Sequence, residues 1–80
     1  MRDPKRISKL MSLLQEIWEK APDLRFFQLI YTLQEKYAAM NNNYGKVINN
    51  SDLPLTGFDF FSLEDDKFEQ FILENKEKLP

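Results

Sequence analysis

The chain has 80 residues, of which 42% are hydrophobic and 30% charged, and its formal net charge is −2. This length suits one self-folding core and leaves no room for a second domain, and the apolar fraction is too high for a disordered chain. The net negative charge argues against nucleic acid as a partner, because proteins that bind nucleic acid usually carry a basic surface that displaces counterions from phosphates.

Cysteine usage and hydropathy predict the compartment. The sequence has no cysteine, which fits a reducing environment. No apolar run follows the basic start "MRDPKRISKL", and no stretch of about 18 apolar residues exists, so neither a signal peptide nor a membrane span is expected. We therefore expect a soluble, cytoplasmic protein without a membrane partner.

The first predicted helix covers residues 4–21. Asp3 is suited to cap its amino terminus and Pro4 to take the first helical position, where the missing N–H costs nothing. Apolar side chains recur at three- and four-residue steps and define one face: Ile7, Leu10, Met11, Leu14, Ile17 and Trp18. At this spacing Trp18 is expected in the core, although an exposed tryptophan often anchors an interface.

The second predicted helix covers residues 24–39, with Asp23 as its amino-terminal cap. Its apolar side chains spread over an arc of roughly 220°, far wider than the stripe of about 100° that packing on one side requires. This arc predicts a central helix that is covered on two sides.

A loop is predicted over residues 40–61, because its first part is rich in asparagine and contains both glycines and Pro54. So long a connection in a small domain indicates a functional appendage or a mobile insertion. Within it, "GKVI" and "LTGFDF" are compatible with a short hairpin.

The third predicted helix covers residues 63–78. Ser62 followed by Asp65 is a variant of the capping box. Acidic residues fill the first turn, and Lys76 and Lys78 the last, as the helix dipole favours. The predicted fold is therefore all-α: a small three-helix bundle, forming one domain over residues 1–80, with a long Asn-rich loop between its second and third helices.

Two stretches resemble the YihD-like family of small bacterial and prophage proteins. They are "LLQEIWEKAPDLRFFQLIYTL" and "DFFSLEDDKFEQFILE", which cover roughly half of the chain. The resemblance implies a helix–Pro-Asp–helix core. It implies no activity and no binding residue, and together with the small size it points to a phage or prophage origin.

The residue inventory removes most catalytic sites. Without histidine or cysteine there is no imidazole base, thiolate nucleophile or zinc site, and no glycine-rich phosphate loop is present. An acidic cluster comprises Asp59, Glu64, Asp65, Asp66 and Glu69. Favourable placement in a first helical turn accounts for these acids better than a bound Mg²⁺ or Ca²⁺. We expect no enzyme activity, no cofactor and no metal.

The basic start of the chain, made by Arg2, Lys5, Arg6 and Lys9, is suited to phosphates or an anionic membrane surface. The favoured interpretation is a solvated face, or contact with the acidic turn of the third helix.

Aromatic residues make up 14% of the chain, more than so small a domain is expected to bury. The predicted function is a non-catalytic helical protein-interaction module, an adaptor or small regulator, that binds another protein or itself. The candidate partner-binding residues are Tyr44, Phe58, Phe60 and Phe61. The alternative is a helix-turn-helix-like DNA-binding protein that uses Arg25, Gln28, Thr32 and Lys36 of the second helix.

Overall fold

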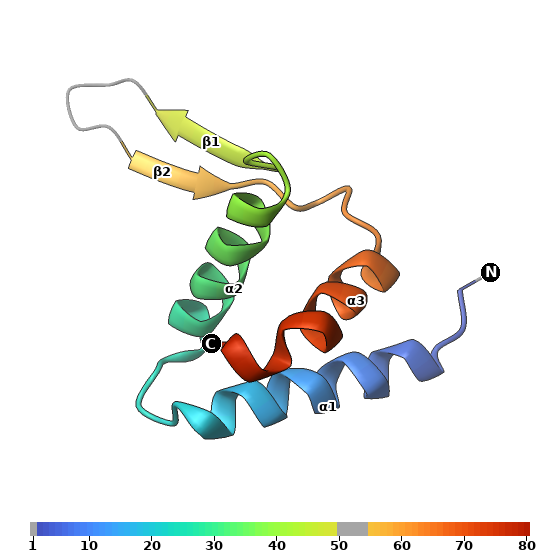
Figure 1. Cartoon of the computed structure of the whole chain (residues 1–80). Coiled ribbons are helices and arrows are strands. Elements are labelled where there is room, and N and C mark those ends of the chain that lie inside the picture. The colour runs from blue at the N-terminus through green and yellow to red at the C-terminus, as the bar shows by residue number, and fades with distance from the viewer. Residues whose placement is uncertain (1, 50–54) are drawn as a thin grey trace.

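A computed structural model describes residues 2–49 and 55–80 (Figure 1). Part of the predicted loop, residues 50–54, lies outside the described residues. The elements in chain order are α1 Lys5–Lys20, α2 Phe26–Met40, β1 Lys46–Asn49, β2 Leu55–Phe58, α3 Asp65–Asn75 and the short 3-10 helix η1 Lys76–Lys78.

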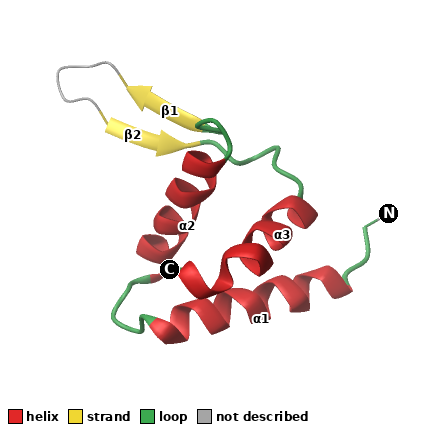
Figure 2. Ribbon diagram, in the orientation of Figure 1, coloured by secondary structure: helices red, strands yellow, loops and turns green. Residues whose placement is uncertain are grey.

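The prediction of an all-α bundle is wrong, because β1 and β2 form an antiparallel two-stranded sheet (Figure 2). Its register pairs Lys46 with Phe58 and Ile48 with Thr56. Val47, Ile48 and Thr56 are β-branched, and such residues favour extended backbone. The hairpin projects from the carboxyl end of α2, and α3 lies on α1 (Figure 1).

The bounds of α1 confirm the first predicted helix to within one residue. The Asp3 carboxylate accepts a hydrogen bond from the backbone N–H of Lys5 at 2.9 Å, as expected of a residue that caps the first turn. At the other end, the N–H of Ala21 donates to the carbonyl of Trp18 at 2.9 Å. Pro22 then follows, and it cannot continue the helix.

The start of α2 differs from the prediction, since Asp23 does not cap it. Arg25 is the last extended residue, and its N–H donates to the Gln28 side-chain oxygen at 2.7 Å. The carbonyl of Leu24 accepts a hydrogen bond from the Trp18 indole N–H, also at 2.7 Å. This bond holds the bend between the two helices. The helix α2 therefore begins at Phe26, two residues later than predicted.

Asparagine residues end α2. Asn42 and Asn43 have φ angles of 57° and 62°, in the left-handed region that asparagine enters more readily than most residues. The N–H of Asn43 donates to the carbonyl of Ala38 at 2.7 Å, which is the long hydrogen bond of a Schellman motif. The Asn-rich run therefore stops the helix and turns the chain into the hairpin.

The predicted cap of α3 is wrong by two residues. Ser62 lies exposed in a turn closed by the hydrogen bond from Leu63 N–H to the Phe60 carbonyl. Glu64 is the last extended residue before α3, and no side chain caps the helix. Because the chain turns after Phe60, α3 begins at Asp65, two residues later than predicted. The last three residues of the predicted span 63–78 form η1.

The core lies where the three helices meet. It consists of Leu13, Leu14, Ile17, Leu29, Leu33, Tyr37, Phe71, Ile72 and Leu79. The buried Asn75 amide donates to the Phe71 carbonyl at 2.8 Å, so this polar side chain is satisfied. Trp18, expected in the core, is half-buried and packs at its edge.

The molecule is a thin plate with extents of 43 × 35 × 19 Å. Its accessible surface of 6283 Å² is nearly a quarter larger than the roughly 5,100 Å² expected for a folded monomer of this mass. Several large apolar side chains are exposed, among them Met11, Phe26, Phe27 and Phe61, and their positions define the candidate site.

Candidate protein-interaction surface

Three of the four predicted partner-binding residues lie together at the base of the hairpin. The ring of Phe60 is 5.6 Å from that of Tyr44 and 6.0 Å from that of Phe58. Phe58 also packs edge-on against Tyr31 of α2 at 5.4 Å. Phe61 is separate and 95% exposed.

Tyr37 joins this group to the core. The buried Tyr37 ring lies 5.4 Å from Phe60, 5.8 Å from Tyr44 and 5.2 Å from Phe71. All three pairs are edge-to-face, an arrangement that is favourable beyond the burial of area. Tyr44, Phe58 and Phe60 therefore attach the hairpin to α2, and only part of each ring is left for a partner.

A second apolar surface, which the sequence analysis did not identify, lies at the bend between α1 and α2. It is a groove of about 410 Å³ lined by Met11, Leu14, Gln15, Trp18, Glu19, Pro22 and Phe26. We call it the α1–α2 groove. Its walls are almost entirely apolar, with Gln15 and Glu19 as the polar lining residues.

The groove arises because the apolar arc of α1 is wider than the core requires. At 100° per residue this arc spans roughly 160°. One edge, with Leu13 and Ile17, is buried, whereas Ile7 and Met11 on the other edge are each 52% exposed. The arc was visible in the sequence, but which edge would be covered depends on where α3 packs.

An aromatic row borders the groove. The Trp18 ring lies 5.6 Å from that of Phe26, and the Phe26 ring lies 5.3 Å from that of Phe27. Phe26 is 44% exposed and Phe27 is 79% exposed. An apolar cavity and a protruding aromatic ring thus lie next to each other on one surface.

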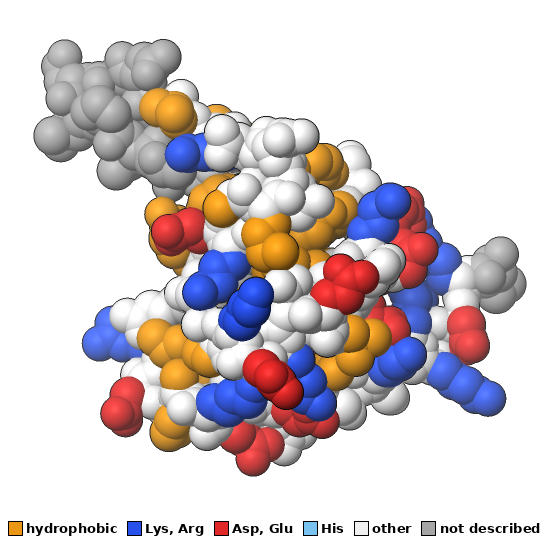
Figure 3. All heavy atoms as spheres, in the orientation of Figure 1, with side chains coloured by type: hydrophobic (Ala, Val, Ile, Leu, Met, Phe, Trp, Pro, Cys, Tyr) orange, Lys and Arg blue, Asp and Glu red, His pale blue; other side chains and the backbone are white. Residues whose placement is uncertain are grey.

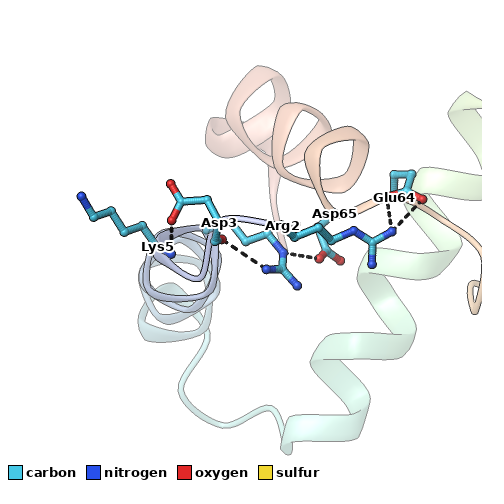
Figure 4. Close-up of polar contacts among 6 residues, drawn as sticks. Arg2, Asp3, Lys5, Glu64 and Asp65 are labelled. Atoms are coloured by element: carbon cyan, nitrogen blue, oxygen red, sulfur yellow. Dashed lines mark hydrogen bonds and ion pairs between the residues drawn. The ribbon is translucent and has the colours of Figure 1, made fainter.

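Ion pairs away from the groove join α1 and the residues before it to α3 and the turn before it. Arg2 contacts Glu64 at 2.8 Å, Arg6 contacts Asp65 at 2.9 Å and Lys9 contacts Glu69 at 2.8 Å. The first two pairs lie at the start of α1 (Figure 4). The expected contact between the basic start of the chain and the acidic turn of the third helix is confirmed.

Two other kinds of site can be checked in the described part of the chain. There, no group of three or more acidic side chains is placed to hold a metal ion. Nor does any helix in that part combine the length and apolarity needed to cross a bilayer.

The residues of the DNA-binding alternative do not form a purely polar face. Arg25 and Gln28 are exposed and Thr32 and Lys36 are half-buried. The Thr32 hydroxyl donates to the Gln28 carbonyl at 2.8 Å. The exposed Phe27 lies within the same run of residues, where a recognition helix would present polar groups to base edges.

Comparison with protein-family models, curated proteins and solved structures gives no match to this chain. The YihD-like resemblance stays a prediction from the two motifs, and the inference of function rests on the geometry of the surface.

Proposed function

We propose that the protein is a non-catalytic protein-interaction module, an adaptor or small regulator, whose docking site is the α1–α2 groove. The observation that supports this proposal is the coincidence of an apolar groove with half-exposed Met11 and Phe26 in its lining. Methionine and aromatic side chains are enriched in protein interfaces, where they fill pockets on the partner.

The groove is preorganised, which lowers the entropy lost on binding. The hydrogen bond from Trp18 to Leu24 holds the indole against the bend, and Phe26 packs on the same ring. A partner side chain would therefore enter a cavity whose walls are already in place.

The hairpin base supports the proposal less strongly than the groove does. Tyr44, Phe58 and Phe60 use much of their ring surface on one another and on Tyr37. They and Phe61 stay a predicted secondary contact. Figure 3 shows apolar side chains over this region mixed with charged ones.

The test compares two substitutions at equally exposed apolar positions. Met11 in the groove is 52% exposed and Val47 on the hairpin is 53% exposed. Neither Met11→Glu nor Val47→Glu should change the free energy of unfolding by more than about 1 kcal/mol, because the new carboxylate reaches water. Each variant is immobilised beside the unchanged protein, and bound proteins from the native host are identified.

Partners that Val47→Glu retains and Met11→Glu loses would support the groove as the docking site. Binding proteins that both variants retain would overturn it. Recovery of nucleic acid without protein would support the DNA-binding alternative.

A further inference from the structure

We infer that oxidation of Met11 to its sulfoxide closes the α1–α2 groove to partners, so that the docking site responds to peroxides. This inference rests on the proposed function, since it names a regulation of the same site.

The first argument is the sulfur content of the chain. The sequence contains no cysteine and three methionines, so its sulfur chemistry is that of the thioether. Met11 and Met40 lie in the described residues, where they are 52% and 60% exposed. A peroxide in solution therefore reaches both side chains in the folded protein.

The second argument is the position of these two side chains. Met11 lines the α1–α2 groove, in which Gln15 and Glu19 are the polar lining residues. Met40 lines two clefts between the end of α2 and α3, where Asn41 and Lys67 are among several polar neighbours. A new polar group at Met11 therefore changes an apolar docking surface, whereas the same group at Met40 joins a surface that is already polar.

The reaction is a two-electron oxidation. A lone pair of the Met11 sulfur attacks one oxygen of hydrogen peroxide, the S–O bond forms as the O–O bond breaks, and the other oxygen leaves as water. The sulfur is oxidised and the peroxide is reduced. The product is a polar side chain in place of a flexible apolar one, and sulfoxide reductases return it to the thioether with electrons from thiols.

The effect on docking follows from the half-exposure of Met11. In the free protein the sulfoxide oxygen reaches water, so the fold is expected to keep its stability. An apolar side chain of a partner that fills the groove would remove this water. Because a polar group buried without a hydrogen bond is unfavourable, the affinity should fall by about 10-fold or more.

The test treats the full chain with hydrogen peroxide and follows each methionine by mass spectrometry of its peptides. Met11 and Met40 should each gain one oxygen atom, while the urea midpoint stays unchanged. Host proteins are then captured as described for Met11→Glu, and each chain is compared with itself before and after treatment. The unchanged chain should capture its partners about 10-fold less well after peroxide. Sulfoxide reductases with dithiothreitol should restore the capture.

Two variants assign the effect to one sulfur. Peroxide should not change the capture by Met11→Leu, because leucine has no thioether, whereas Met40→Leu should lose its partners on treatment as the unchanged chain does. A second measurement needs no variant. Captured partners should slow the oxidation of Met11 and not that of Met40, because binding and oxidation at one site are reciprocally linked.

Three results would each overturn the inference: a Met11 that peroxide leaves unoxidised in the folded chain, equal capture before and after treatment, or an equal loss of partners by Met11→Leu. None of them would decide the proposed function, because Met11→Glu tests the groove without peroxide. If Met11→Glu retains every partner, the proposed function fails, and the inference fails with it.

Discussion

Gly45 occupies the point where the chain leaves the turn after α2 and enters the hairpin. Its φ angle is +71°, in the left-handed region. A Cβ atom built there would lie 2.7 Å from the Asp59 carbonyl oxygen and from the Phe60 ring. The Asp59 N–H donates to the Gly45 carbonyl at 2.7 Å, so this backbone cannot move away cheaply. Glycine is therefore required here for its conformation and for its lack of a side chain.

Gly45→Ala should lower the free energy of unfolding by at least about 2 kcal/mol, because the left-handed penalty of about 1 kcal/mol adds to the steric overlap. Gly57 is the internal control, since a Cβ atom there would meet nothing within 4 Å. Urea denaturation of both variants provides the measurement. Equal urea midpoints for Gly45→Ala and Gly57→Ala would show that the hairpin base accommodates the added methyl group without loss of stability.

At the scale of elements, α2 is partly what its wide apolar arc predicts. Leu29 and Leu33 are fully buried, and Tyr31 contacts Phe58 of the hairpin on another side of the helix. The arc also includes Phe27 and Tyr31, which are 79% and 44% exposed. The helix is therefore covered on two sides over only part of its length.

Leu33→Ala should lower the free energy of unfolding by about 2–5 kcal/mol, because it removes buried methyl groups and leaves a cavity. The same change at Leu73, which is 48% exposed, should cost about 1 kcal/mol or less. Thermal unfolding of the two variants at equal protein concentration provides the comparison. If both changes cost the same, Leu33 would not lie in the core.

The sequence predicted those elements whose bounds are set by neighbouring residues, and it failed where contacts distant in sequence decide. The span of α1 followed from its apolar spacing and from Asp3 and Pro4. The prediction that Ser62 caps the third helix was wrong because the same residue types occur in helix caps and in turns. Here Ser62 lies in the turn after Phe60. Which edge of α1 stays exposed, and hence the groove, depends on the packing of α3, about 50 residues further along the chain, which no local pattern reports.

At the scale of the whole molecule, the ion pairs and the net charge argue against the DNA-binding alternative. Three basic side chains at the start of the chain contact acids of α3 or of the turn before it, at 2.8–2.9 Å. Cations paired in this way are less available to displace counterions from a phosphate backbone. The formal net charge of −2 adds a general repulsion.

The unchanged chain should therefore bind duplex DNA weakly, with a dissociation constant no tighter than about 10⁻⁴ M at physiological salt. Neutralising the paired acids, as Glu64→Gln, Asp65→Asn and Glu69→Gln together, changes the formal net charge from −2 to +1. This variant should gain nonspecific binding that weakens steeply with salt, because about three cations become free to contact phosphates. Fluorescence anisotropy of a labelled duplex across a salt series measures both quantities.

The matched control neutralises three exposed acids that form none of these three ion pairs, as Glu35→Gln, Glu74→Gln and Glu77→Gln together. It reaches the same net charge but leaves the start of the chain paired, so it should bind DNA less tightly than the first variant. Equal affinity of the two variants for the duplex would mean that net charge alone, and not the ion pairs, accounts for the weak binding of the unchanged chain. Binding of the unchanged chain to one particular duplex at about 10⁻⁸ M or tighter would instead establish sequence-specific recognition, because nonspecific contacts do not reach that affinity at physiological salt. In that case the exposed residues Arg25 and Gln28 of the bend and of α2 would have to enter the major groove of DNA, and Phe27 would lie against it.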